Sequence, residues 1–136
     1  MSFLSSPEYD ACVEHINLGI KFEKLKNTDE AILYYEEAIA FRIVATHPYD
    51  RLIVIYNKRK DYRNTLRVVK LAIDVFTNEN IRRSTNLIND YPDLKSKIEF
   101  HLETNESFKD EKGKWIFVQY DVMKYYDKLT NLKNKI

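Results

Sequence analysis

An internal repeat constrains this sequence more than any other feature, because the first half aligns with itself at a fixed offset. Leu18 aligns with Leu52, 34 positions later, and the same offset places small or apolar residues of one copy on those of the other. Matches at such positions indicate that the two segments share one packing scheme. The clearest further pairs are Phe22 with Tyr56, Ala38 with Ala72 and Ile39 with Ile73.

Each copy is predicted to form two helices. Apolar residues recur every three or four positions, as at Ile32, Tyr35 and Ile39, and this is the spacing of one helix face. The chain of 136 residues has 2 Gly and 3 Pro, which is too few for the many tight turns of a β-sandwich or barrel. We therefore predict an all-α fold, a single helical domain over 1–136, with its first four helices at 7–26, 29–44, 48–60 and 62–77.

Helix start signals support this division. Ser6 is a suitable cap for a first helix that has Pro7 in its first turn, because proline tolerates that position. Thr28 precedes two acidic residues, which are favourable at the positive end of a helix dipole. Thr46 is expected to begin the third helix.

The spacing of large and small residues resembles the tetratricopeptide repeat (TPR) motif. The first repeat, 7–45, carries His15, Leu18, Gly19, Phe22, Ala31, Tyr35 and Ala38. The second repeat, 46–78, keeps the spacing but has Ile53 in place of glycine and Thr65 in place of alanine. The resemblance implies antiparallel helical hairpins stacked as a short TPR-like solenoid. The alternative is a pair of unrelated hairpins whose period is accidental.

The second half of the chain follows the motif less closely. Helical spacing continues to a break at Pro92 and predicts a degenerate third hairpin over 79–104, with helices at 79–90 and 92–104. The charged stretch 104–114 contains Gly113 and is predicted to be an exposed loop.

A long C-terminal helix is predicted within 113–136, because apolar residues from Trp115 to Ile136 recur at alternating steps of three and four. It either caps the repeats, which need a terminal helix with a polar outer face, or joins two copies as a homodimer. A second stripe, Ile116, Tyr120 and Met123, predicts that the first part of this helix packs on two sides. The opening residues Trp115 to Val118 leave a strand as the alternative.

The sequence offers little chemistry. The lone cysteine, Cys12, has no partner for a disulfide, and the three histidines are not at metal-ligand spacing. Two isolated glycines exclude a glycine-rich phosphate loop. We therefore expect no catalytic residues, no metal and no cofactor, and we predict that the chain is not an enzyme. Without a secretion signal or a long apolar run, it is expected to be cytoplasmic, with no membrane partner.

The resemblance implies a protein–protein interaction module, in which the first helix of each hairpin lines a concave groove for a peptide or an amphipathic helix. TPR proteins that hold chaperone tails use Lys and Asn at positions where this chain has Ile16 and Ile20, so that clamp is absent from the first repeat. The predicted groove residues are Val13, Ile16, Ile20, Glu23 and Lys24 in the first repeat and Asp50, Arg51, Val54, Asn57 and Lys58 in the second.

A basic turn supplies a third hypothesis, a nucleic-acid-binding accessory protein. Residues 58–70 surround the turn of the second repeat and include the candidate phosphate contacts Arg59, Lys60, Arg63 and Arg67. A solvated hairpin turn is the favoured explanation, because Asp61 interrupts the run and the whole chain has a formal charge of only +1. Nucleic acid is therefore not expected as the main partner.

Overall fold

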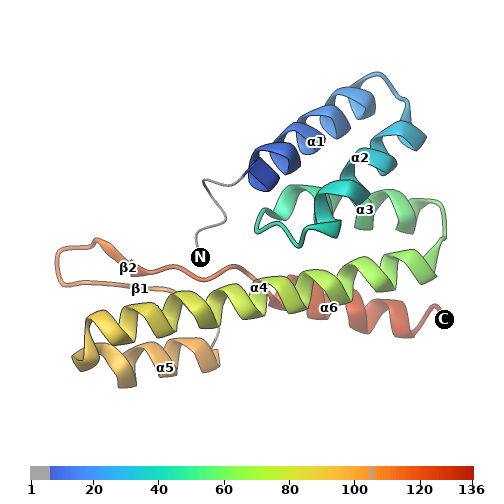
Figure 1. The fold of residues 1–136 in the computed structure, drawn as a ribbon. Helices are drawn as coiled ribbons and strands as arrows, with labels where there is room; N and C mark the ends of the chain where they lie inside the picture. The colour runs from blue at the N-terminus through green and yellow to red at the C-terminus, as the bar shows by residue number, and fades with distance from the viewer. Residues whose placement is uncertain (1–6, 105) are drawn as a thin grey trace.

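The computed structural model describes residues 7–104 and 106–136, and over this part the chain is mostly helical, as predicted (Figure 1). The helices are α1 (Pro7–Lys24), α2 (Thr28–Ala40), α3 (Thr46–Lys58), α4 (Tyr62–Asp90), α5 (Lys95–Thr104) and α6 (Met123–Lys133). A 3-10 turn, η2 (Pro92–Leu94), precedes α5, and the strands β1 (Phe108–Lys109) and β2 (Trp115–Phe117) form a small antiparallel sheet.

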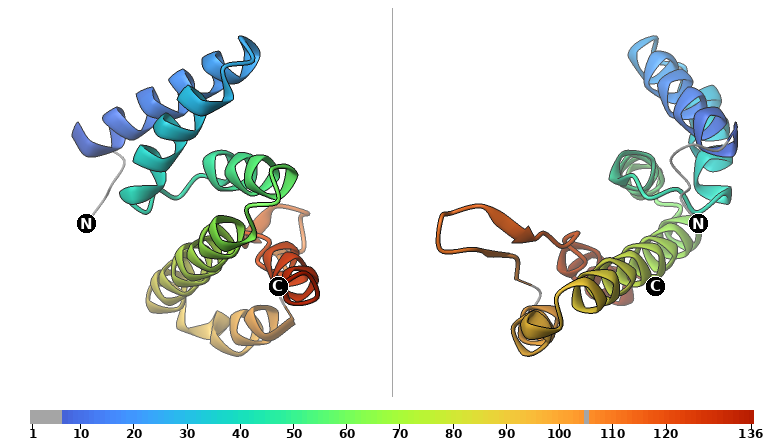
Figure 2. Two further views of the ribbon diagram at one scale, coloured as in Figure 1. Left: turned by 90° about the vertical axis from the view of Figure 1, so that its right-hand side faces the viewer. Right: turned by 60° about the vertical axis from the view of Figure 1, so that its left-hand side comes forward.

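Successive helices of the first half pack on one another. Helix α1 packs on α2, α2 on α3 and α3 on α4, while α6 returns to lie along α4, as both views in Figure 2 show. Helix α1 begins at Pro7 and α3 at Thr46, as predicted. Asn27, not Thr28, caps α2 by accepting a hydrogen bond from the Glu30 amide at 3.4 Å. The predicted cap at Ser6 lies outside the described residues.

Residues that align across the repeat are buried in both hairpins. Ala31 and Ala38 in α2 and Ala72 in α4 have no exposed surface, and Thr65, which replaces an alanine of the motif, is 1% exposed. These small side chains let neighbouring helices approach closely. The shared packing scheme inferred from the alignment is thus visible at these positions.

The turns within the two hairpins also repeat. Lys26 and Lys60, which align with each other, both adopt the left-handed conformation with φ of 61° and 59°. After each lysine a backbone amide bonds back into the preceding helix, from Asn27 to the Phe22 carbonyl and from Asp61 to the Tyr56 carbonyl. Glycine usually ends helices in this way because a side chain strains the left-handed region. The same strained turn therefore closes the first helix of both hairpins.

The predicted division near residue 78 is wrong, because α4 runs without a break from Tyr62 to Asp90. Two polar residues beyond that point, Asn80 and Ser84, are buried and hydrogen-bonded within the continuous helix. The Asn80 amide donates to the Tyr120 carbonyl at 3.1 Å and accepts from the Tyr120 amide at 2.8 Å, while the Ser84 hydroxyl donates to the Ile81 carbonyl. The first arm of the expected hairpin 79–104 is thus the second half of α4, and α5 is its second arm.

The long C-terminal helix over 113–136 is also wrong, since helix α6 begins only at Met123. Residues 115–117 form β2, the strand alternative, with Phe117 opposite Phe108 and Trp115 opposite Lys109. The predicted loop 104–114 accordingly contains β1. Phe108 and Phe117 pack with Ile98 of α5 into a second, smaller core, and this contact between distant segments favours the strands. Ile116, Tyr120 and Met123 therefore do not share a helix face.

Part of the predicted apolar seam survives in α6 and packs within the chain. Val122, Tyr125 and Leu132 are buried in the main core, and Leu129 packs against it. Ile136, at the end of the seam, is 71% exposed. The residues that a second copy would have used are thus largely covered by the chain's own helices.

Replacing Gly19 with Ala should lower the free energy of unfolding by about 1 kcal/mol net. A Cβ atom at Gly19 would lie 2.4 Å from the Tyr35 ring, and that ring is buried with its hydroxyl bonded to Glu23, so it cannot move aside. Overpacking of this kind costs roughly 1–3 kcal/mol, which outweighs the gain of up to about 1 kcal/mol in helix propensity.

Chemical denaturation of both Gly19→Ala and the control Asn17→Ala measures this effect. Asn17 is exposed on the same helix, so its replacement should be neutral or slightly stabilising. Equal stability of the two variants would contradict the close contact.

Candidate functional site

The first candidate site is a hollow of about 240 Å³ between α1 and α3. Glu23 of α1 accepts two hydrogen bonds from Arg51 of α3, at 2.9 and 2.7 Å, and a third from the Tyr35 hydroxyl at 2.7 Å. The His47 Nε2 atom lies 3.4 Å from the same hydroxyl. Ile20 and Lys24 complete the lining. The hollow is therefore built around the Glu23 carboxylate, which accepts three side-chain hydrogen bonds.

The charges in this hollow stabilise one another. Hydrogen bonds from Arg51 lower the pKa of Glu23, with a smaller effect from Tyr35, and overcome the opposing effect of burial. The same carboxylate raises the pKa of Arg51. Burial first, and then the hydrogen bond to Glu23, raise the pKa of Tyr35. The site thus holds an ion pair beside a neutral tyrosine.

A second hollow of about 320 Å³ lies between α3 and α6. Ile53, Val54, Asn57 and Lys58 of α3 line it together with Lys128 of α6. Val54 is 43% exposed, so an apolar side chain is available between the polar ones. Arg51, Val54 and Lys58 follow one another at helical spacing on α3, and they connect this hollow with the first. We call the two hollows and this stripe of α3 the groove.

Helix α6 is held against α3 by Asp50. The Tyr125 hydroxyl donates to Asp50 at 2.7 Å, and the Lys124 ammonium lies 3.1 Å from the other oxygen. Burial of Tyr125 and its hydrogen bond to Asp50 raise the tyrosine pKa. Asp50, one of the predicted groove residues, therefore anchors a neighbouring helix.

The structure brings together most of the predicted groove residues. Ile20, Glu23 and Lys24 line the first hollow with Arg51, and Val54, Asn57 and Lys58 line the second. Val13 and Ile16 line neither, and Ile16 packs against the main core. Ile16 is thus better described as a partly buried packing residue than as a free contact for a partner.

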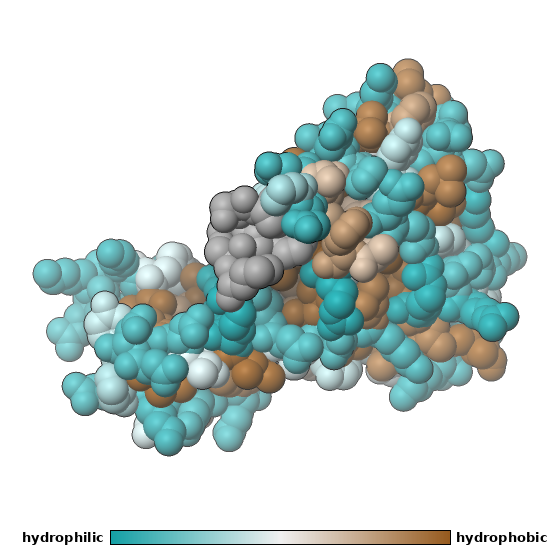
Figure 3. Space-filling view, viewed as in Figure 1, coloured by the Kyte–Doolittle hydropathy of each residue, from teal (hydrophilic) through white to brown (hydrophobic). Residues whose placement is uncertain are grey.

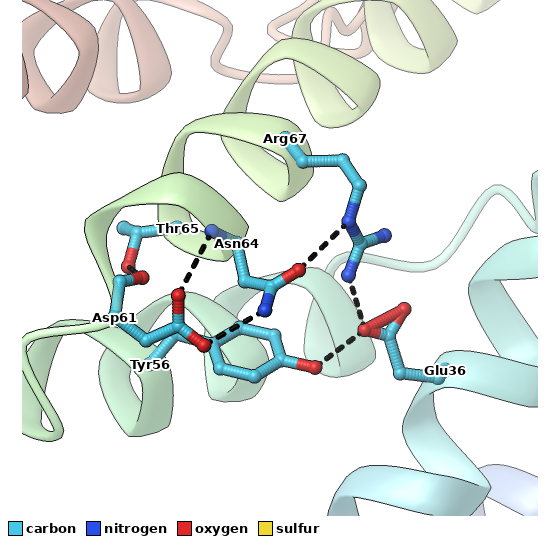
Figure 4. Close-up of polar contacts among 6 residues, drawn as sticks. All are labelled: Glu36, Tyr56, Asp61, Asn64, Thr65 and Arg67. Carbon is cyan, nitrogen blue, oxygen red and sulfur yellow. Dashed lines mark hydrogen bonds and ion pairs between the residues drawn. The ribbon is translucent and has the colours of Figure 1, made fainter.

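A related network, shown in Figure 4, joins the two hairpins through Glu36, Tyr56 and Arg67. Glu36 of α2 accepts a hydrogen bond from the Tyr56 hydroxyl of α3 at 2.6 Å and pairs with Arg67 of α4. The guanidinium of Arg67 also donates to Asn64 at 3.2 Å. These bonds join α2, α3 and α4.

The four candidate phosphate contacts are unequally available. Arg67 pairs with Glu36, and Arg59 pairs with Asp29 at 2.9 Å. Arg63 helps to lower the pKa of Asp61, although the hydrogen bonds from Asn64 are the larger cause. Lys60 is exposed in its left-handed turn. The basic turn is therefore partly neutralised by the chain's own carboxylates.

Sequence reasoning missed Lys128, the residue that α6 contributes to the groove. Lys128 was part of a helix predicted to cap the repeats or to join two copies. Its spacing of four from Lys124, which bonds to Asp50 of α3, places both lysines on one helix face. A third hollow, of about 380 Å³, was also missed because it joins segments distant in sequence: α4 near Ile81, α5 near Leu102 and the start of α6 near Met123.

The described residues carry no cluster of three or more His, Cys, Asp or Glu side chains arranged to hold a metal ion. His15 lies 3.1 Å from Glu37, while His47 belongs to the first hollow and His101 stacks on Phe108. Among helices within 7–104 and 106–136, none has the length and apolarity needed to span a membrane. Figure 3 shows a mostly hydrophilic face with several separate apolar areas.

No protein family, no curated protein and no solved structure matches this chain. Its function must therefore be argued from the residues and their geometry.

Replacing Glu23 with Gln should lower the free energy of unfolding by about 1–2 kcal/mol at pH 7. Hydrogen bonds to charged groups contribute roughly 1.5–3 kcal/mol, and partial exposure of Arg51 weakens them. Because the folded pKa of Glu23 lies below its ordinary value of 4.5, this stabilisation is complete above that pH. It is lost as the pH falls through the folded pKa, so wild type and variant should converge in acid.

Denaturation curves from pH 7 to pH 3 test the effect, with Asp29→Asn as the matched control. Asp29 also joins the two hairpins, through Arg59, but its side chain is 86% exposed, so the change should be a few tenths of a kcal/mol. A loss in Glu23→Gln that stays constant down to pH 3 would show that its charge is not the cause.

Proposed function

We propose that this chain is a TPR-like protein–protein interaction module that binds a peptide or an amphipathic helix in the groove. The observation that carries the proposal is the exposed stripe of α3, Arg51, Val54 and Lys58, with a hollow on each side of it. A peptide laid across this stripe would contact three helices at once, which is how helical repeat proteins use a concave surface.

Three observations support the TPR-like arrangement. The small residues of the motif are buried in both hairpins, with Gly19 against Tyr35 in the first. Both hairpins have the same left-handed lysine turn. Helix α6 packs on α4 and bonds to α3 through Asp50, so it occupies the place that the first helix of a third repeat would take. In this arrangement α1, α3 and α6 form the inner layer of a short solenoid.

The groove's chemistry suits an amphipathic partner with acidic residues. Val54 and the partly buried Ile20 offer apolar contact. Lys24, Lys58 and Lys128 surround them, whereas the carboxylates of Glu23 and Asp50 are already bonded to side chains of this protein. This supports a binding role without catalysis, because the carboxylates of Glu23 and Asp50 hold neighbouring helices together.

The self-associating alternative receives no comparable support. Tyr125 and Leu132, which a dimer seam would need, are buried in the main core. The binding proposal therefore takes precedence over the homodimer.

Replacing Val54 with Glu should weaken binding of groove ligands by at least roughly tenfold, because an added carboxylate would be desolvated beneath the ligand without a partner. The probes are peptides selected from a displayed random library with the full chain as bait. Fluorescence anisotropy with wild type and variant gives the affinities.

Leu33→Glu is the matched control, since Leu33 is 57% exposed and lines none of the hollows described above. Affinities should be unchanged in this variant. If the selected peptides bind Val54→Glu as well as they bind wild type, the groove is not the binding surface.

A further inference from the structure

The groove continues past Val54 into a smaller hollow of about 110 Å³ near the end of α6. This hollow and the 320 Å³ hollow share Ile53, Asn57 and Lys128. Together they gather three ammonium groups and two side-chain amides over an apolar floor that includes Leu132. We call Asn57, Lys58, Lys128, Asn131 and Lys135 the lysine–asparagine site.

No acidic residue lines either hollow. Within the described chain, Asn57, Lys58, Lys128 and Asn131 have no side-chain hydrogen bond or ion pair, and Lys135 lies over the Tyr62 ring at 5.5 Å. Lys124 lies one helical turn before Lys128 and, unlike Lys128, forms an ion pair, with Asp50.

Asp50 and Asp61, the acidic residues before and after Asn57 and Lys58 in the chain, already accept hydrogen bonds. Asp50 is bonded to Tyr125 and Lys124, and Asp61 accepts from the Asn64 amide groups at 3.3 and 2.7 Å. None of the three lysines of the site forms an ion pair with a described residue, and Lys128 is partly buried. An unpaired ammonium beside apolar side chains is stabilised by an anion that enters the hollow.

We propose that the lysine–asparagine site binds the phosphate of a phosphorylated serine or threonine in the peptide that occupies the groove. The inference rests on the proposed function. A phosphate monoester carries about −1.5 to −2 charges at pH 7 and has three acceptor oxygens, which match three ammonium groups and two amide donors. A carboxylate has one charge and would leave most of the lysine charge unbalanced. Val54 lies in the same hollow, so an apolar residue of the peptide sits beside the phosphorylated one.

A single phosphate suits the surroundings better than a nucleic-acid strand. A strand needs a track of successive phosphate contacts and open aromatic faces for its bases. Beyond the site, Arg59 and Arg67 pair with Asp29 and Glu36. Within it, Lys135 lies over the Tyr62 ring, so two arginines of the basic turn and this aromatic face are already engaged.

The test compares three mixtures of short random peptides that have phosphoserine, serine or glutamate at one central position. Binding to the full chain is measured by anisotropy. We expect the phosphoserine mixture to bind at least roughly tenfold tighter than the other two, as two or more charge-assisted hydrogen bonds allow. Inorganic phosphate should compete with it and should shift the side-chain amide NMR signals of Asn57 and Asn131.

Two double variants locate the effect. Lys58→Gln with Lys128→Gln should abolish the preference for phosphoserine, whereas Lys21→Gln with Lys112→Gln removes the same charge from exposed positions outside the groove and should preserve it. If both double variants lose the preference for phosphoserine equally, the preference comes from the overall positive charge and the proposal is overturned. Tighter binding of a single-stranded RNA than of the phosphoserine mixture would overturn it in favour of nucleic acid.

The outcomes also separate this site from the groove. Library-selected peptides that depend on Val54 but gain nothing from phosphoserine would leave the proposed function intact and remove the phosphate site. Phosphoserine binding that depends on Lys128 but is unaffected by Val54→Glu would support the site and reject the groove. Thermal melting of each variant checks that the protein stays folded, which is expected because the substituted residues are exposed or partly buried.

Discussion

Tyr35 connects the packing of the first hairpin to its attachment to the second. Its ring fills the space that Gly19 leaves open, and its hydroxyl binds Glu23, which in turn holds Arg51 of α3. Any change that displaces this ring therefore disturbs both the contact within the hairpin and the contact between hairpins. Tyr35, Glu23 and Arg51 also line the first hollow of the groove.

The same combination of tyrosine, carboxylate and cation recurs at two other places where helices meet. Glu36 joins Tyr56 to Arg67, and Asp50 joins Tyr125 to Lys124; both carboxylates lie on a different segment from the tyrosine that they bind. Each network contributes at most a few kcal/mol, comparable to burial of one large apolar side chain. The core therefore supplies most of the stability, while the directional bonds determine how one segment is oriented on the next.

The repeat was predictable from sequence because its packing is local. Ala38 and Ala72, at equivalent positions in their helices, are fully buried. The rest of the fold depends on contacts between residues that are distant in sequence. Helix α4 continues past the predicted division near residue 78, and its buried Asn80 amide is bonded to the backbone of Tyr120, 40 residues away. Likewise, Trp115 begins a strand because Phe117 packs with Phe108 and Ile98. The groove was predicted in part, since α3 provides its floor, whereas Lys128 required knowledge of where α6 lies.

The two separate cores have a consequence for how the molecule opens. The main core extends along the first half of α4, and a smaller one, with Ile98, Phe108 and Phe117 at its centre, lies against Leu87 and Ile88 near the end of that helix. Three buried side chains provide much less resistance to local unfolding than the main core does. Amide hydrogens of α5 and the β-hairpin should therefore exchange with solvent sooner than those of α3. The molecule should therefore open as two cooperative units on one helix, with the unit that carries the groove still folded while the other opens.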